Sequence, residues 1–294
     1  MDNFRTPFST PLAERAREAF LRACRLDVET SKPGNVSVAS AGHGMTSAQF
    51  IASAGAAAAG LFVPRARVGA RILDAVRRTF DAAGCNTNLG IVLLAAPLCA
   101  ALERFGANEP IDASRWHAHT QRVLAELDVD DARLAYRAIA LANPGGLGDA
   151  PEQPVHAPPT VTLRAAMELA AGRDSIARQY ANGFADIFGA GLDAAGVITP
   201  ATEHRAMLDV FLSFLSNWPD SHIVRKQGAA LAQSVTCDAA MHRANWRASG
   251  HPAESDALEA WDAGLKARGI NPGTSADLAV ATLFVALLTS STNA

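Results

Sequence analysis

The stretch from Gly84 to Leu98, GCNTNLGIVLLAAPL, decides the fold. A polar loop flanked by glycines leads directly into an almost wholly apolar segment of helical length. A helix without a polar side does not face water, so we predict a largely buried central helix around which the chain packs. This helix carries the loop Asn86-Thr87-Asn88 to an interior or cleft position. Asn86 is suited to cap the helix, which leaves Asn88 in need of a partner if it is buried.

The composition favours helices over sheets. Of the 294 residues, 49% are hydrophobic and only 6% are aromatic, and alanine dominates the apolar share. Alanine has the highest helix propensity, whereas strands prefer β-branched and aromatic side chains. No stretch shows the alternation of a strand. We therefore predict an all-α, single-domain multi-helix bundle over residues 1–294, with a proline-rich loop at residues 149–159.

Capping residues and glycine or proline breaks set the expected helix boundaries. Thr10 and Pro11 begin the first helix, and the spacing from Thr46 to Gln49 fits a capping box at the second. Asp130 is expected to cap a helix that ends at Ala142. The full set of expected helices covers residues 10–29, 46–60, 65–82, 89–102, 112–127, 130–142, 163–171, 175–188, 200–218, 221–247, 253–267 and 274–288.

Charge and hydropathy exclude several classes of partner. A net charge of -3 and a pI near 6.2 give no general attraction to nucleic acid or to anionic membranes. The apolar runs at residues 89–102 and 278–288 fall short of the roughly 20 residues that a membrane span requires. Residues 1–11 lack the apolar region of a signal peptide, and the cysteines form no CxxC pair. We expect a cytoplasmic protein without nucleic-acid or membrane partners.

Four glycine-bearing loops each adjoin a predicted helix, at residues 32–35, 84–90, 143–148 and 271–275. Glycines let the backbone approach a ligand closely, and N–H groups at helix N-termini favour phosphate. None of the loops is a Walker A loop or a strand-borne GxGxxG motif. Whether they are helix boundaries or binding loops stays open from the loops alone.

The densest polar cluster is DSHIVRKQG, residues 220–228. If Asp220 caps a helix, then His222, Arg225 and Lys226 share a face in its first turns. Basic side chains oppose the helix dipole at this end, and an anionic ligand would remove that conflict. The alternative is a solvated basic face with a capping aspartate.

Two further carboxylates have competing roles. Asp277 follows Thr274 by three positions, which favours a capping box over its other role as a magnesium ligand. Glu29 stands at the end of the first helix, just before Lys32, where the helix dipole disfavours an acid. Glu29 is therefore a candidate for metal binding or acid–base catalysis.

Four segments, taken together and in this order, resemble one known family: ETSKPGNV (29–36), NTNLG (86–90), DSHIVRK (220–226) and NPGTSADL (271–278). This family is that of the triphosphoribosyl-dephospho-CoA synthases, which includes the citrate lyase and malonate decarboxylase prosthetic-group enzymes. The citrate lyase type has leucine in place of Asn35, and histidine followed by a basic residue in place of Asn88 and Leu89. These departures resemble a branch found in methanogens and methylotrophs.

The resemblance implies a transferase that moves the triphosphoribosyl group of ATP to the ribose 2'-hydroxyl of 3'-dephospho-CoA and releases adenine. It implies small-molecule partners, ATP as a substrate and Mg²⁺ as a cofactor. The residues implied as catalytic are Glu29, Asp220 and His222, and those implied as magnesium ligands are Glu29, Asp220 and Asp277. The residues implied to bind substrate or phosphate are Lys32, Asn35, Asn86, Thr87, Asn88, Arg225, Lys226, Thr274 and Ser275.

Asn35 and Asn88 leave room for a second hypothesis, a related ATP-dependent transfer in tetrahydromethanopterin or methanofuran biosynthesis. A third hypothesis is a non-catalytic nucleotide-binding protein whose loops only hold a phosphate. A homodimer is a further possibility that the sequence leaves open.

Overall fold

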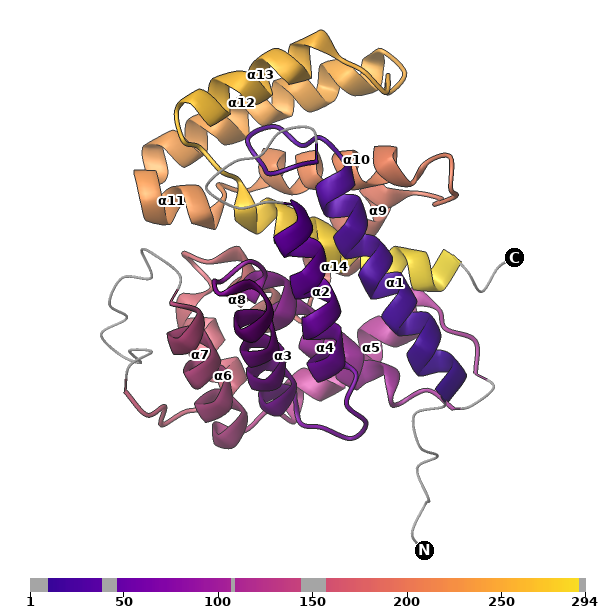
Figure 1. The fold of residues 1–294 in the computed structure, drawn as a ribbon, viewed down its shortest axis with the longest axis vertical. Coiled ribbons are helices and arrows are strands. Elements are labelled where there is room, and N and C mark those ends of the chain that lie inside the picture. The colour runs from indigo at the N-terminus through magenta and orange to yellow at the C-terminus, as the bar shows by residue number, and fades with distance from the viewer. Residues whose placement is uncertain (1–9, 39–46, 107–108, 144–156, 291–294) are drawn as a thin grey trace, which may run out of the picture.

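The computed structural model describes residues 10–38, 47–106, 109–143 and 157–290. Every regular element in these ranges is a helix, which confirms the all-α prediction (Figure 1). The elements, including one π-helical turn, η1, are α1 Thr10–Glu29, α2 Ser47–Leu61, α3 Val68–Ala83, α4 Leu89–Leu102, α5 Ala113–Ala125, α6 Val129–Ala142, α7 Leu163–Ala170, α8 Ser175–Asn182, η1 Ile187–Gly191, α9 Leu192–Ala195, α10 Glu203–Asn217, α11 Ser221–Gln227, α12 Ala229–Ala248, α13 Asp256–Ala267 and α14 Gly273–Ser290.

The predicted buried helix, α4, lies at the centre of the molecule. All of its residues except Ala100 are buried. Pro97 within the helix has no N–H, so the carbonyl of Leu93 lacks its usual helical donor. The hydroxyl of Tyr180 on α8 donates to that carbonyl at 2.6 Å. The central helix therefore keeps its buried backbone satisfied through a neighbouring helix.

A second apolar helix, α14, packs against α4, α1 and α10 (Figure 1). Within the described residues, α14 alone is long and apolar enough to cross a membrane by length and composition. Yet 72% of it is buried inside the protein. Its contacts with three other helices make α14 a core helix, as the apolar run at residues 278–288 predicted.

Two predicted helices are each broken by a glycine. The helix expected over 175–188 ends at Gly183, where Gly183 and Phe184 both have positive φ, of 72° and 66°. The helix expected over 221–247 is interrupted at Gly228, with φ of 92°. Both breaks were missed because the helical pattern of apolar residues continues on either side. Glycine adopts such left-handed backbone at no steric cost, so it redirects the chain here.

Other boundaries differ at the helix ends. Asp128, not Asp130, caps α6, and it forms a capping box with Asp131. The capping box expected at Thr46 to Gln49 and most of the proline-rich loop at 149–159 lie outside the described residues. The single-domain organisation stays a prediction.

Candidate active site

A cavity of about 910 Å³ opens where many helix ends meet. The C-terminal ends of α1, α3, α6 and α7 contribute side chains to it, as do the N-terminal ends of α4, α8 and α14, together with α11. N-terminal helix ends present free N–H groups and a positive partial charge. The cavity thus combines the room of a large ligand site with the N-terminal ends of α4 and α14, whose partial charge favours anions, while the end of α8 is capped by Asp174.

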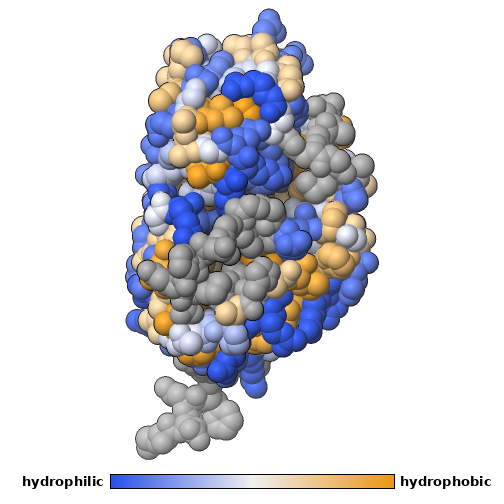
Figure 2. All heavy atoms as spheres, turned by 90° about the vertical axis from the view of Figure 1, so that its left-hand side faces the viewer, coloured by the Kyte–Doolittle hydropathy of each residue, from blue (hydrophilic) through white to orange (hydrophobic). Residues whose placement is uncertain are grey.

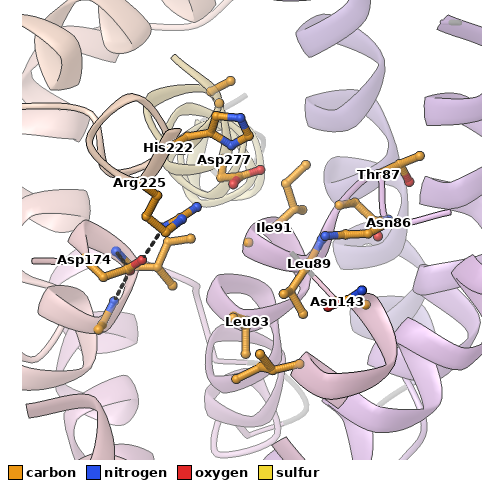
Figure 3. A pocket seen from close by; sticks show the side chains of 18 of the residues that line it. Asn86, Thr87, Leu89, Ile91, Leu93, Asn143, Asp174, His222, Arg225 and Asp277 are labelled. Atoms are coloured by element: carbon orange, nitrogen blue, oxygen red, sulfur yellow. Dashed lines mark hydrogen bonds and ion pairs between the residues drawn. The ribbon is translucent and has the colours of Figure 1, made fainter. Parts of the chain in front are cut away.

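Asp277 projects from α14 into this cavity, above the start of α4 (Figure 3). The carboxylate occupies the space beside Gly90, since a Cβ on Gly90 would lie 2.1 Å from Asp277 Oδ2. Burial, and then the charges of Asp27 and Asp220, raise the pKa of Asp277 well above its usual value. The capping-box role that the spacing favoured does not hold, because α14 begins at Gly273, before Thr274.

A second carboxylate, Asp27, reaches the cavity from the last turn of α1. Lys32 is fully buried, and its Nζ lies 3.1 Å from Asp27 Oδ1. The same ammonium donates to the carbonyl oxygens of Asp27 and Thr30. Burial raises the pKa of Asp27, and Lys32 opposes that rise. Lys32 does not line the cavity, so it acts as the counter-ion of Asp27 rather than as a free phosphate ligand.

We expect Lys32→Met to lower the free energy of unfolding by about 3–5 kcal/mol at neutral pH, because it strands a buried carboxylate. Without Lys32 the pKa of Asp27 rises further, so Asp27 takes up a proton in the folded state as the pH falls. The loss in free energy of unfolding should therefore be smaller at low pH. Urea unfolding in a chelating buffer at about pH 8 and about pH 5 measures both effects. A loss independent of pH would contradict the pairing. Lys266→Met, in the less buried pair with Asp262, is the matched control and should cost less.

Another wall of the cavity is basic and comes from α11. His222, Arg225 and Lys226 all line the cavity, as their shared helix face predicted. Arg225 Nη1 donates to Asp174 Oδ2 at 2.7 Å (Figure 3), and Asp174 Oδ1 caps α8. The buried Nε of Arg225 has no hydrogen-bond partner among the described residues. The site therefore holds an oriented guanidinium whose buried Nε–H is available to a ligand.

The sequence of this chain matches, over residues 13–294, the CitG family, described as ATP:dephospho-CoA triphosphoribosyl transferase. The chain belongs to this family. It is therefore a transferase that acts on ATP and dephospho-CoA, as the resemblance implied. The hypotheses of a pterin or furan acceptor and of a non-catalytic binding protein receive no support from the comparisons.

A solved structure shares the fold. It is a crystal structure from Archaeoglobus fulgidus, assigned as a triphosphoribosyl-dephospho-CoA synthase, which aligns with a TM-score of 0.59 and 21% identity. The alignment covers 82% of this chain and 98% of the archaeal one. No curated protein matches the chain.

The family resemblance implied several site residues that do not line the cavity. They lie behind its wall and hydrogen-bond to the helices that form it. Asp220 Oδ1 accepts from the backbone N–H groups of His222 and Ile223, at 2.9 and 3.2 Å. Its Oδ2 accepts from the N–H and hydroxyl of Ser275, at 2.7 and 2.8 Å. Asp220, Thr274 and Ser275 are all buried, and none of them lines the cavity. Asp220 thus ties α11 to α14 and positions His222.

Glu29 does not line the cavity either. Its carboxylate pairs with Arg22 at 2.8 Å, at the surface of α1. Asp27, two residues earlier, occupies the place that was expected for Glu29. Helical spacing could have indicated this, because Phe20, Cys24 and Asp27 follow one another on the buried face of α1.

The Asn-Thr-Asn loop lines the cavity as predicted. Asn86 Oδ1 accepts from Leu89 N at 3.1 Å, and the Thr87 hydroxyl donates to Ser53 Oγ at 2.7 Å. Asn88 is the N-cap residue of α4, but its side chain makes no capping bond. On another wall, Asn35 Nδ2 donates to Asn271 Oδ1 at 2.9 Å. Asn86 lies across the cavity from Arg225 of α11 (Figure 3).

The residues that could hold a metal are fewer than expected. No group of three metal-ligating side chains comes together in the described part of the chain, so Glu29, Asp220 and Asp277 do not form one site. Asp27 and Asp277 both reach the cavity, and the charge of Asp27 raises the pKa of Asp277. Magnesium needs only one or two protein carboxylates when phosphates complete its coordination. This pair fits that requirement.

Proposed function

We propose that this cavity is the place where the triphosphoribosyl group passes from ATP to 3'-dephospho-CoA. The bond between C1' of ATP and the adenine nitrogen breaks, and a bond from C1' to the 2'-oxygen of the acceptor forms. The 2'-hydroxyl of 3'-dephospho-CoA gives up a proton, and the departing adenine takes one up. The step therefore needs a base close to that hydroxyl. The carboxylate of Asp277, which lies beside His222 and Arg225 of the basic wall in one cavity, is the observation that carries this assignment.

The basic wall is the proposed site of the triphosphate. Arg225 and Lys226 supply positive charge, and the N-terminal ends of α4 and α14 add a positive partial charge that favours phosphate. Asp174 fixes the direction of the Arg225 guanidinium. A pre-oriented cation of this kind loses less side-chain entropy when the phosphate binds.

Asp27 and Asp277 are the proposed magnesium ligands. A divalent cation between the two carboxylates would relieve the repulsion that raises the pKa of Asp277. When bound, magnesium would neutralise triphosphate charge and orient the donor. Lys32 holds Asp27 in place for this task.

His222 is the proposed proton acceptor for the attacking hydroxyl. Its ring lies against Gly273, one helical turn before Asp277, and it lines the cavity. An imidazole can exchange a proton near neutral pH. Asp220 holds the first turn of α11 and so determines where this ring stands.

The test of the proposal is adenine release from ATP and 3'-dephospho-CoA, followed by chromatography with and without magnesium. We expect release only when all three are present. Adenine that forms without the acceptor would point to hydrolysis instead of transfer. A folded protein that releases none under any of these conditions would overturn the proposal.

Lys226→Ala is expected to raise the KM for ATP about tenfold, because one charge-assisted contact to phosphate is worth roughly 1.5–3 kcal/mol. The KM for dephospho-CoA should change less. Lys226 is exposed, so the variant should fold normally. Arg77→Ala removes an exposed cation on α3 that does not line the cavity, and it serves as the control. An unchanged KM for ATP would remove Lys226 from the phosphate site.

A cytoplasmic location and a homodimer stay predictions from the sequence.

A further inference from the structure

The two ends of the cavity differ in chemistry. One end carries the charged residues of α1, α11 and α14 described above. The other end is formed by the C-terminal ends of α3, α6 and α7, where Phe80, Leu141 and Leu169 line the cavity. Because α3 packs against α6, and α6 against α7, these three side chains belong to one continuous wall. We call Phe80, Leu141 and Leu169 the apolar wall.

The apolar wall is exposed to solvent. The exposed fractions of Phe80, Leu141 and Leu169 are 40%, 36% and 50%. Only five other large hydrophobic residues in the described part of the chain are comparably exposed. Figure 2 shows the side of the molecule formed by α6, α7 and α11, where hydrophobic atoms reach the surface among hydrophilic ones. Apolar side chains gathered in a cavity indicate a ligand that covers them.

The size of the cavity agrees with a second occupant. A volume of about 910 Å³ is near the upper end of the roughly 300–1,000 Å³ that small-molecule sites span. Transfer from donor to acceptor requires both molecules at once, with the reacting atoms about 3–3.5 Å apart. The donor triphosphate has its place at the charged end. The acceptor must therefore extend from the reacting centre toward the other end.

The chemistry of the acceptor matches this end. The acceptor 3'-dephospho-CoA consists of ADP joined to a pantetheine arm, which carries two methyl groups on one carbon, two amides and a thiol. The arm is uncharged, and its methyl and methylene groups are apolar surface that the wall can cover. Alongside the apolar wall, the cavity is lined by the amides of Asn86 and Asn143, which can pair with the amides of the arm (Figure 3).

Resting on the proposed function, we infer that the apolar wall binds the pantetheine arm of the acceptor. This contact makes the enzyme select dephospho-CoA over a plain adenine nucleotide that carries the same 2'-hydroxyl. Each methylene that the wall covers adds to the affinity for the acceptor. The donor ATP gains nothing from the wall.

Calorimetric binding of 3'-dephospho-CoA and of ADP, each without ATP, tests the inference. We expect the wild type to bind dephospho-CoA at least about tenfold more tightly than ADP. Leu169→Gln should remove about fivefold to tenfold of the affinity for dephospho-CoA and leave ADP and ATP binding unchanged. Leu141→Gln is an independent second variant at the same wall. Met241→Gln alters a residue of α12 that is 57% exposed and outside the cavity, and it is the control.

Three outcomes decide the matter separately from the proposed function. If Leu169→Gln and Leu141→Gln weaken ADP or ATP as much as dephospho-CoA, the wall holds a nucleotide base and the inference is overturned. If the wild type binds ADP and dephospho-CoA equally while still releasing adenine, the inference fails and the transfer stands. If binding depends on the arm but no adenine is released, the inference stands and the proposed transfer fails.

Discussion

In the Asp277→Asn variant, adenine release is expected to fall by about a hundredfold or more, because the magnesium ligand that we propose Asp277 to be is worth several kcal/mol in the transition state. The amide keeps the shape of the side chain but loses its charge. Binding of magnesium in the presence of ATP should weaken in parallel. Both are measured directly, the first by chromatography of adenine and the second by calorimetric titration.

The same variant should fold at least as stably as the wild type in metal-free buffer. Burial and the charge of Asp27 raise the pKa of Asp277, so the folded state binds its proton more tightly than the unfolded chain does. That stabilisation is fully present below the unfolded pKa and is lost as the pH rises through the folded pKa. Asparagine cannot take up the proton, so the variant gains stability relative to the wild type as the pH rises.

Urea unfolding in a chelating buffer at about pH 5 and about pH 8 checks this sign. Asp193→Asn, at an exposed aspartate on α9 that does not line the cavity, is the control for both readouts. Full activity in Asp277→Asn would exclude Asp277 from metal binding and from the reaction.

The second large loss of activity is expected from Gly90→Ala, which adds a single methyl group. In Gly90→Ala the new Cβ would lie 2.1 Å from Asp277 Oδ2 and 2.6 Å from Asp277 Cγ. It would also lie 2.7 Å from the terminal methyl of Ile176, which can move aside more easily. We expect adenine release to fall about as far as in Asp277→Asn, and the free energy of unfolding to fall by about 1–3 kcal/mol from overpacking.

A double-mutant cycle separates this clash from a general disturbance of α4. Asp277→Ala removes the atoms that the new methyl group meets, so Gly90→Ala should cost much less stability in that background. Activity should not return, because the carboxylate is missing. Gly55→Ala is the matched control, since a Cβ on Gly55 of α2 would meet nothing within 4 Å. Additive losses of stability in the cycle would show that Gly90 and Asp277 do not oppose each other.

The sequence predicts those features of the site that are determined by neighbouring residues within one helix. The burial of α4 followed from its composition, because a helix without a polar side has only one suitable environment. The shared face of His222, Arg225 and Lys226 followed from helical spacing. These are properties of a few neighbouring residues, and the structure has them as expected.

Three of the residues implied for the site do not line the cavity, because their side chains are bound by other residues of the chain. Asp220 has the features of a catalytic acid, but its second oxygen is satisfied by Ser275, 55 positions later. Lys32 has the features of a phosphate ligand in the sequence, but its ammonium forms an ion pair with Asp27 in the structure. The helix dipole disfavours an acid at the position of Glu29, which made Glu29 a candidate site residue. In the structure its ion pair with Arg22 at the surface compensates for that unfavourable position. Local patterns cannot show which polar groups are already satisfied by distant ones.

Pro97 in the central helix leaves a backbone carbonyl for α8 to bind. Because Pro97 has no N–H, the carbonyl of Leu93 lacks its helical donor, and the hydroxyl of Tyr180 on α8 donates to it instead. The same α8 begins at Asp174, the residue that aligns Arg225. Leu93, which lines the cavity, is thus bound by α8, and Arg225 is bound by the residue that caps α8, so one short helix connects the floor of the cavity to its cationic side.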